Sequence, residues 1–290
     1  MKAAFLAILL FIQVFVLAQS SILWEVTGPK IKSLYLMGTM HIANEQILDL
    51  PDSVFICMKK SKVLALELDM DKTGGAAMAL KMMKLIKMPK DTSYADLLSR
   101  SDLIYLNNAL KEQLAPPFNK VWAGLRPAFV GLLILQQDSN FNADTALLPL
   151  DMYLHQKSKD FKMKHKGLET MEEQLAALNA TPLKAQAESL VAALKDTTSQ
   201  ALYNDLLQAY MDQDIDALYQ IIHAEEGNSS FKQNILTNRN YSMTDKMLLL
   251  AKKKRTFVAV GAGHLGGEEG ILALLKKQGY TLRPVQVPYR

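Results

Sequence analysis

Cysteine is almost absent from this chain: Cys57 is the single one among 290 residues. One cysteine excludes an intramolecular disulfide framework and any zinc cluster built from cysteine. Histidine is also scarce, with five in the chain. Any chemistry must therefore come from these histidines, from carboxylates and from backbone groups.

An excess of charge of one sign is missing as well. Lysine and arginine number 33 against 29 aspartate and glutamate, a net charge of +4, and no run of five basic residues occurs. Nucleic-acid binding needs a basic patch, so we expect no nucleic-acid partner. Glycine (14) and proline (10) are too few for a low-complexity chain, and 49% hydrophobic residues is typical of globular proteins.

Long hydrophobic runs are confined to the N-terminus. Lys2 is followed by an apolar stretch over 3–16 and then by Leu17 and Ala18, the pattern of a secretory signal peptide. We expect residues 1–18 to be removed after Ala18 and the mature chain, 19–290, to be periplasmic or secreted. An uncleaved membrane anchor is the alternative. No later segment is apolar for 18 residues, so the mature chain is not expected to span a membrane.

Short apolar runs predict strands at both ends of the chain. Turn residues separate the first two runs, which predicts a hairpin. A predicted helix over 52–60 connects the runs 33–37 and 63–69, and a predicted helix over 268–278 connects the runs 256–260 and 281–287. Helical connections favour parallel pairing of the strands they join, with right-handed crossovers. The predicted strands cover 22–26, 33–37, 63–69, 256–260 and 281–287.

Helical periodicity dominates between these two ends. Thr170 and Glu173 form a capping-box pattern that predicts one helix start. We therefore predict an α/β fold: a single domain over 19–290 whose one mixed sheet is built from both chain ends, with a large helical insertion over about 74–252. The predicted helices cover 76–88, 94–114, 127–137, 143–158, 171–178 and most of 182–252, with a weaker strand at 161–167.

Two histidines follow predicted strands in the same way. His41 lies three residues after Gly38, and His264 lies three residues after Gly261. Open α/β sheets place their ligand crevices at the carboxyl ends of strands, and a glycine there lets the backbone turn sharply. Either histidine alone is compatible with a structural role, but the repeated arrangement points to a functional pair.

Glu67 interrupts the apolar run 63–69. A buried carboxylate is costly unless it is paired or binds a metal, although a solvated strand end would also accommodate it. Two neutral imidazoles, His41 and His264, with the Glu67 carboxylate and a bound water make a divalent-metal site. Without thiolates, manganese, cobalt, zinc and iron all remain candidates.

Three further residues can belong to this site. Glu169 follows a strand-like run and is either a helix N-terminal carboxylate or a second carboxylate of the site. Arg239 and Asn240 either orient a substrate carboxylate or carbonyl or lie on a solvated helix face.

We expect the three remaining histidines to lie outside the functional site. Asp151 and His155 are one helical turn apart and are predicted to form a local pair, while His165 and His223 are predicted at the surface.

The order of these motifs resembles the TraB/GumN (TraB/PrgY) family, bacterial relatives of the Tiki metalloproteases. The resemblance implies an α/β core like those of erythromycin esterase-like and Tiki-like proteins, with His41, Glu67 and His264 grouped at one site. It also implies divalent-metal-dependent cleavage of peptides. The stretches that carry it are Leu23-Trp24-Glu25-Val26, Tyr35-Leu36-Met37-Gly38-Thr39-Met40-His41, Leu64-Ala65-Leu66-Glu67-Leu68-Asp69, Gly167-Leu168-Glu169-Thr170, Glu173-Gln174, Arg239-Asn240 and Phe257-Val258-Ala259-Val260-Gly261-Ala262-Gly263-His264-Leu265.

These features together predict an exported metal-dependent hydrolase, a peptidase that acts on a peptide or protein substrate with a metal-activated water. Glu67, if it is not a ligand, or otherwise Glu169 would accept the proton of that water, and Arg239 would stabilise developing charge. Two alternatives remain open: a non-catalytic module that binds a metal, haem or peptide, and a metal-free esterase-like hydrolase with a histidine base.

Overall fold

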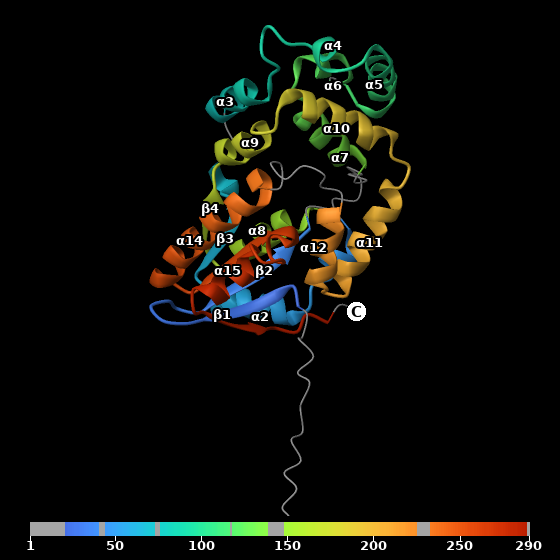
Figure 1. The fold of residues 1–290 in the computed structure, drawn as a ribbon. Coiled ribbons are helices and arrows are strands. Elements are labelled where there is room, and N and C mark those ends of the chain that lie inside the picture. Colours follow the sequence, from blue (N-terminus) through green and yellow to red (C-terminus); the bar gives the residue numbers. More distant parts are fainter. Residues whose placement is uncertain are drawn as a thin grey trace, which may run out of the picture.

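The computed structural model describes residues 21–40, 44–72, 76–116, 118–138, 148–224 and 233–288. A six-stranded sheet lies at the centre of one part of the molecule, helices pack on both of its faces, and a group of helices stands beyond one end (Figure 1). The strands are β1 (Leu23–Thr27), β2 (Leu34–Thr39), β3 (Val63–Leu68), β4 (Lys164–Glu169), β5 (Thr256–Gly261) and β6 (Thr281–Pro284).

The sheet is mixed, as predicted, and its strand order is β4-β3-β5-β2-β1-β6. The neighbours β4, β3, β5 and β2 are parallel. The hairpin partner β1 runs antiparallel to both β2 and β6. The fold is therefore α/β, with a sheet built from strands of both chain ends.

The predicted pairing within each strand–helix–strand unit is wrong. β5 lies between β2 and β3, and both β2 and β1 separate β5 from β6. The burial of the strands gives the reason. β5 is buried along nearly its whole length and forms ladders on both sides. β6 is half-exposed and ends at Pro284, which lacks an N–H donor and suits an edge strand.

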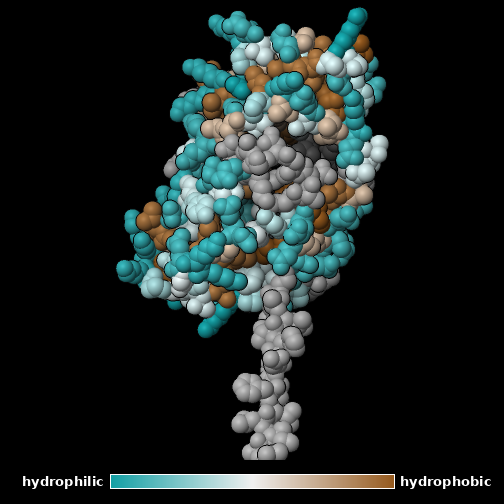
Figure 2. Space-filling view, viewed as in Figure 1, coloured by the Kyte–Doolittle hydropathy of each residue, from teal (hydrophilic) through white to brown (hydrophobic). Residues whose placement is uncertain are grey.

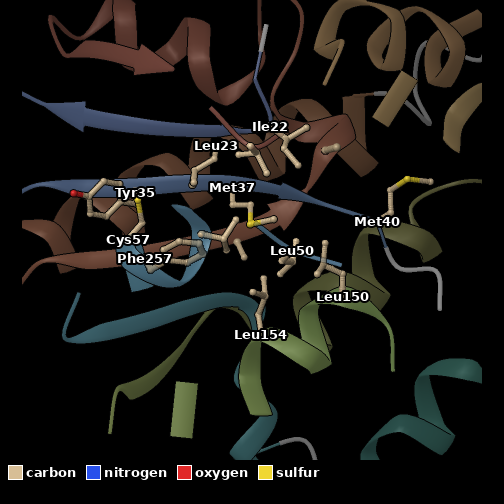
Figure 3. Packing of buried hydrophobic residues seen from close by; sticks show 14 of the residues in the cluster. Ile22, Leu23, Tyr35, Met37, Met40, Leu50, Cys57, Leu150, Leu154 and Phe257 are labelled. Carbon is tan, nitrogen blue, oxygen red and sulfur yellow. The ribbon is translucent and has the colours of Figure 1, made fainter. Parts of the chain in front are cut away.

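One face of the sheet packs against helices from the middle and the start of the chain. Figure 3 shows Met37 and Phe257 of the sheet beside Leu150 and Leu154 of a helix, within one buried apolar cluster. Cys57 belongs to the same cluster, and burial raises its pKa to about 11. The helices on this face are α1 (Glu45–Leu48), α2 (Asp52–Lys60), α8 (Leu150–Asp160), α11 (Ser199–Met211) and α12 (Ile215–Ala224).

The opposite face packs against α14 (Asn238–Lys253) and α15 (Ile271–Lys277). Met243 and Met247 of α14 contact the sheet in a second apolar cluster. We call the six strands with the helices on their two faces the sheet body. Short one-turn elements join its parts: η1 (Met70–Lys72), η3 (Gln233–Thr237) and η4 (Ala262–His264).

The helical lobe, residues 76–138 and 171–195, stands at the upper end of the sheet body in Figure 1. It has its own apolar cluster around Leu106, Leu110 and Trp122. Its elements are α3 (Ala76–Ile86), α4 (Tyr94–Leu97), α5 (Arg100–Gln113), α6 (Phe118–Val121), η2 (Trp122–Gly124), α7 (Pro127–Asp138), α9 (Met171–Asn179) and α10 (Leu183–Lys195).

Several helix boundaries in the structure differ from those predicted. The single helix predicted over 94–114 is two helices, because the Ser99 hydroxyl accepts from the Asp102 N–H and starts α5 there. A break at 212–214, where Gln213 has φ of 59°, separates α11 from α12. β4 comes from within the range 74–252, yet it pairs with β3 in the sheet.

Some predictions fall outside the described residues, namely the segment 1–18, His41 and the helix start at 143. Within the described parts of the chain, no helix combines the length and the hydropathy needed to cross a membrane. Figure 2 shows hydrophilic side chains projecting over both the sheet body and the helical lobe, with smaller hydrophobic groups between them.

Candidate functional site

The carboxyl ends of four parallel strands meet at one edge of the sheet. Glu169 is the last residue of β4 and Glu67 is the last but one of β3. Gly261 ends β5 beside Thr39, which ends β2. His41 follows Thr39 by two residues but is not among the described residues. This edge, with the side chains that reach it from α9, α14 and η4, is called the strand-end site below.

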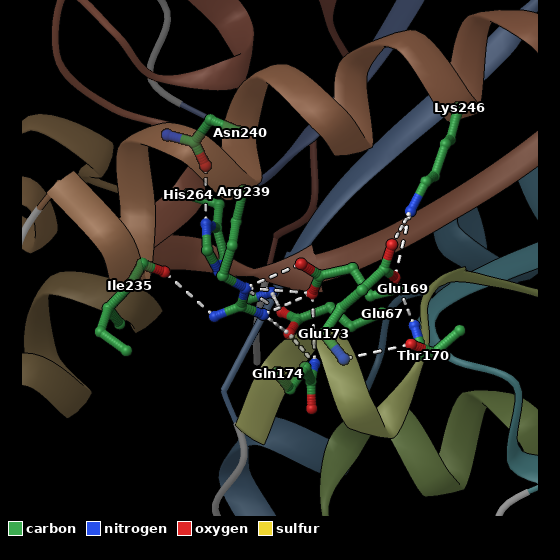
Figure 4. A network of polar contacts seen from close by, with 11 residues as sticks. Glu67, Glu169, Thr170, Glu173, Gln174, Ile235, Arg239, Asn240, Lys246 and His264 are labelled. Atoms are coloured by element: carbon green, nitrogen blue, oxygen red, sulfur yellow. Dashed lines mark hydrogen bonds and ion pairs between the residues drawn. The ribbon is translucent and has the colours of Figure 1, made fainter. Parts of the chain in front are cut away.

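Arg239 bridges the two carboxylates of this site (Figure 4). Its Nη2 donates to Glu67 Oε2 at 2.7 Å and to Glu169 Oε2 at 2.6 Å, and its Nε donates to Glu169 Oε1 at 2.9 Å. The side chains of Glu67 and Glu169 are 11% and 3% exposed. Glu67 is therefore not at a solvated strand end, and Arg239 is not on a solvated helix face.

The charges of this network do not cancel. Burial disfavours the charge of Arg239, but the hydrogen bond to Glu169 and the charges of Glu67 and Glu169 outweigh burial and raise the pKa of Arg239. One guanidinium thus faces two carboxylates. With both carboxylates ionised, the site has one net negative charge in a buried environment, which favours a bound cation.

Asn240, next to Arg239 on α14, orients His264. Its Nδ2 donates to the Glu269 carbonyl at 2.8 Å, which points its Oδ1 at His264 Nδ1, 2.6 Å away. An amide oxygen can only accept, so Nδ1 carries the hydrogen. The neutral imidazole then has its lone pair on Nε2, which lies 3.8 Å from Glu67 Oε1.

This pair of atoms suits a divalent metal ion. Ligand nitrogen and oxygen atoms lie about 2.0–2.2 Å from zinc-like ions, so two atoms 3.8 Å apart can share one ion. The hydrogen bond to Asn240 is of the kind that fixes the tautomer of a metal-binding histidine. Of the three predicted ligands, the structure brings Glu67 and His264 together, and His41 is not described.

The sequence analysis did not predict that the Gln174 side chain and the Gly261 N–H contact the carboxylates of the site. Gln174 Nε2, from α9, donates to Glu67 Oε2 at 3.1 Å and to Glu169 Oε2 at 3.3 Å. The Gly261 N–H donates to Glu67 Oε1 at 2.7 Å. The capping box of Thr170 and Glu173, which was predicted, starts α9 and so places Gln174 one residue further on.

The glycines before the two histidines act differently from the prediction. Gly38 lies within β2, and a Cβ there would be 2.8 Å from Leu265 Cδ1 and 3.1 Å from Ala262 Cα. Gly261 has an ordinary φ of −51°. Close packing of η4 against β2, rather than a sharp turn, is therefore the physical reason for Gly38.

Two cavities flank the first turn of α14. One, of about 230 Å³, is lined by Asn240, Tyr219 and Glu269 among others. The other, of about 260 Å³, is lined by Glu169, Arg239 and Ser242 among others. Drug-sized ligands occupy about 300–1,000 Å³, so each cavity has room for a side chain rather than for a large molecule.

A second polar cluster consists of Asp71, His155 and His165. His155 Nε2 lies 3.1 Å from Asp71 Oδ1, and His165 Nδ1 lies 2.7 Å from Asp71 Oδ2. One ligand atom from each of the three lies within 4.8 Å of the others, close enough to hold a metal ion. The prediction of His165 at the surface is wrong: its side chain is 11% exposed. The side chain of His223 is not described.

Comparison of the sequence with known proteins identifies a family. The sequence profile of the TraB/PrgY/gumN family matches residues 22–284. The chain belongs to this family. The resemblance inferred from the motifs is thereby confirmed.

Curated relatives of this TraB/PrgY/gumN protein include Metalloprotease TIKI2 of Xenopus tropicalis, 25% identical over 91% of this chain and 59% of the relative. Metalloprotease TIKI1 of the same species is 23% identical over 86% of this chain and 58% of the relative. Metalloprotease TIKI2 of Danio rerio is 25% identical over 93% and 62%. The chain thus spans about three fifths of the length of these relatives. No solved structure shows significant similarity.

Proposed function

We propose that this protein is a divalent-metal-dependent hydrolase that cleaves peptide bonds at the strand-end site. Two findings support metal-dependent hydrolysis in general: the relatives are named metalloproteases, and Asp71, His155 and His165 form a set that could hold a divalent ion. Peptides or proteins as substrates, and the strand-end site as the place of reaction, are our assignments.

The observation that carries this proposal is the orientation of His264. Asn240 fixes the hydrogen on Nδ1, so the Nε2 lone pair lies 3.8 Å from the Glu67 carboxylate. His264, Glu67 and, by its sequence position, His41 would hold the ion. When bound, a divalent ion polarises a carbonyl and lowers the pKa of water towards neutrality.

The neighbouring residues are best described as positioning residues. Both oxygens of Glu169 accept hydrogen bonds from Arg239, so Glu169 anchors the guanidinium beside Glu67. Arg239 in turn holds Glu67 Oε2, while its Nη1 donates to the Ile235 carbonyl at 3.1 Å. Its role is to fix the two carboxylates rather than to contact substrate.

Peptide turnover with and without a chelator tests the proposal. We expect cleavage of a fluorogenic peptide library by untagged protein to stop after chelation and to return with Mn²⁺, Co²⁺, Zn²⁺ or Fe²⁺. His264→Ala and Glu67→Gln should each lose most activity, and the double variant should lose little more, because both groups serve one ion. Glu188→Gln, on the exposed side of α10, is the matched control.

The alternatives give different results. Turnover that survives chelation would favour a metal-free hydrolase. Retained metal without turnover of any peptide would favour a binding module. The variant Asn240→Ala tests whether the strand-end site is catalytic or only structural. It should lower activity about 10–100-fold, because Asn240 is the hydrogen-bond partner of a metal-binding histidine. The circular dichroism spectrum should stay unchanged.

We also propose export through residues 1–18, on the basis of the apolar stretch 3–16 that follows Lys2. Mass analysis of the native N-terminus should find a chain that begins at or near Gln19. An intact Met1 in a membrane fraction would contradict this proposal.

A further inference from the structure

Ser158 determines the hydrogen positions in the cluster of Asp71, His155 and His165. The Ser158 Oγ lies 2.6 Å from the His155 carbonyl oxygen. A carbonyl can only accept, so the single hydroxyl hydrogen lies in this contact. His165 Nε2 is 2.7 Å from the same Oγ, and it must therefore be the donor.

This arrangement leaves His165 Nδ1 in an unusual position. If the ring is neutral and Nε2 carries the hydrogen, Nδ1 has a lone pair. That lone pair faces Asp71 Oδ2 at 2.7 Å. Two acceptors at this distance repel each other, so a positive species belongs between them: a second proton or a metal ion.

His155 completes a metal-ligand set. Its Nε2 lies 3.1 Å from the other Asp71 oxygen, and its ring centroid lies 4.3 Å from that of His165. The two imidazole side chains are 13% and 11% exposed, whereas Asp71 is 54% exposed. The site is therefore buried on the imidazole side and open to solvent beside the carboxylate, where a water can complete the coordination.

We propose that Asp71 oxygen, His155 Nε2 and His165 Nδ1 bind a divalent ion of the zinc class, at a site separate from the strand-end site. Two imidazoles and one carboxylate favour zinc-like ions over calcium or magnesium, which take oxygen ligands. His165 Nε2 donates a hydrogen bond to Ser158 Oγ, and a hydrogen bond of this kind orients an imidazole whose other nitrogen binds a metal.

The position of the site in the fold indicates what the ion does. It connects η1 to α8 and the edge strand β4, since His155 and His165 lie 84 and 94 residues after Asp71 in the sequence. A Cβ on Gly167 would lie 2.6 Å from the Asp69 backbone N, so η1 approaches β4 closely. Asp71 lies four residues after Glu67, and His165 four residues before Glu169. An ion here fixes the two strands that carry the carboxylates of the strand-end site.

The helices that complete the two sites pack on opposite faces of the sheet. α8, which carries His155, packs against the face that includes Leu64 and Leu66. α14, which carries Arg239, packs against the face that includes Ala65 and Leu168. At about 3.3 Å per residue, His165 and Glu169 are about 13 Å apart along β4. The new site is therefore outside hydrogen-bonding reach of the strand-end site.

Metal stoichiometry of untagged full-length protein tests this proposal. After chelation and titration with Zn²⁺ alone, the double variant Asp71→Asn/His155→Gln should bind one ion fewer than the unchanged protein. Asp160→Asn, an exposed carboxylate change on the same helix, is the matched control and should lose none. Equal stoichiometry in the double variant and the unchanged protein would overturn the proposal.

The strand-end variant Glu67→Gln/His264→Ala separates the two proposals. It should retain the ion of the Asp71 site, and Zn²⁺ should still raise its melting temperature. If it binds no Zn²⁺ while it remains folded by circular dichroism, the Asp71 site does not bind the ion.

A measurement on the unchanged protein avoids any folding defect of the variants. Diethyl pyrocarbonate modifies accessible imidazoles, and mass spectrometry of the resulting peptides locates them. Zn²⁺ should protect His155 and His165 together. Unchanged modification of both at saturating Zn²⁺ would contradict a metal site and would leave a proton as the bridge between His165 and Asp71.

Discussion

The sheet body and the helical lobe place their charged residues differently. In the sheet body, Glu67, Glu169 and Arg239 form a buried network at the strand ends. In the helical lobe, the pair Lys195–Asp102 is 49% and 33% exposed, and Lys184–Glu188 is 70% and 59% exposed. Among the described residues of the lobe, the buried polar residues are the uncharged Thr181 and Gln186, and Gln186 Nε2 donates to the Thr181 carbonyl at 2.7 Å.

The difference shows where binding chemistry can reside. Buried charge costs free energy unless it is paired, so it is retained where a specific arrangement needs it. No charged residue is buried among the described residues of the lobe, and α9 connects the lobe to the site. Leu175 of α9 packs in the lobe cluster, while Gln174 contacts the carboxylates. A shift of α9 with the lobe would therefore move Gln174 relative to the carboxylates.

The largest effect is expected from Arg239→Met in the sheet body. The change leaves two buried carboxylates facing each other without their cation, and breaking a buried ion network by removal of one partner costs about 3–5 kcal/mol. Urea unfolding at pH 7 measures the loss. A loss below about 1 kcal/mol would show that solvent reaches the carboxylates and would remove the contrast with the lobe.

Leu110→Ala tests whether the lobe is stabilised separately. Leu110 is fully buried in the lobe cluster, and such truncations cost about 2–5 kcal/mol. Native-state hydrogen exchange should show faster exchange in α5, α7 and α10, with little change in β3 and β5. Equal acceleration in the strands would mean that the lobe and the sheet body unfold as one unit.

The variant Gln174→Leu tests whether α9 connects the helical lobe to the strand-end site. Two hydrogen bonds to the carboxylates are lost, but Arg239 still pairs with both, so we expect a cost of about 0.5–1.5 kcal/mol. Gln174→Glu should cost more, because it adds a third carboxylate to the network. If the two variants are equally stable in urea, Gln174 does not face Glu67 and Glu169.

The smallest effect is expected from Lys195→Met in the lobe. The Lys195 ammonium and then the Ser99 hydroxyl lower the pKa of Asp102. A lowered acid pKa stabilises the folded state above the unfolded value of about 3.9, and the contribution disappears as the pH falls through the lowered pKa. The small difference in urea midpoint between the variant and the unchanged protein should therefore be present at pH 6 and shrink towards pH 3. A difference independent of pH would assign it to packing of the lysine stem.

Local sequence patterns were enough to locate three central strands and one buried carboxylate of the site. Apolar runs located β2, β3 and β5, and a charged residue within one run located Glu67. The side chains at parallel strand ends converge for geometric reasons, so Glu67 and His264 could be grouped with His41 without a structure, while Glu169 was left with two interpretations.

Long-range arrangement was not accessible in this way. Which strand lies next to β3 depends on packing across the whole sheet, and the runs themselves do not encode it. Asp71, His155 and His165 come from three elements with no shared motif, so the sequence offers no signal for their cluster. The role of Asn240 depends on one side-chain hydrogen bond that spacing cannot predict.

The central place of β5 has a consequence for biosynthesis. β2 and β3 leave the ribosome roughly 220 and 190 residues before the strand that fills the space between them. At about 5–20 residues per second, the backbone N–H and C=O groups on the facing edges of these two apolar strands stay unpaired for on the order of 10–45 s. During this time the two strands can pair with wrong partners. We therefore expect the nascent chain to depend on chaperones until its last fifth has been synthesised. The strand-end site can form only then.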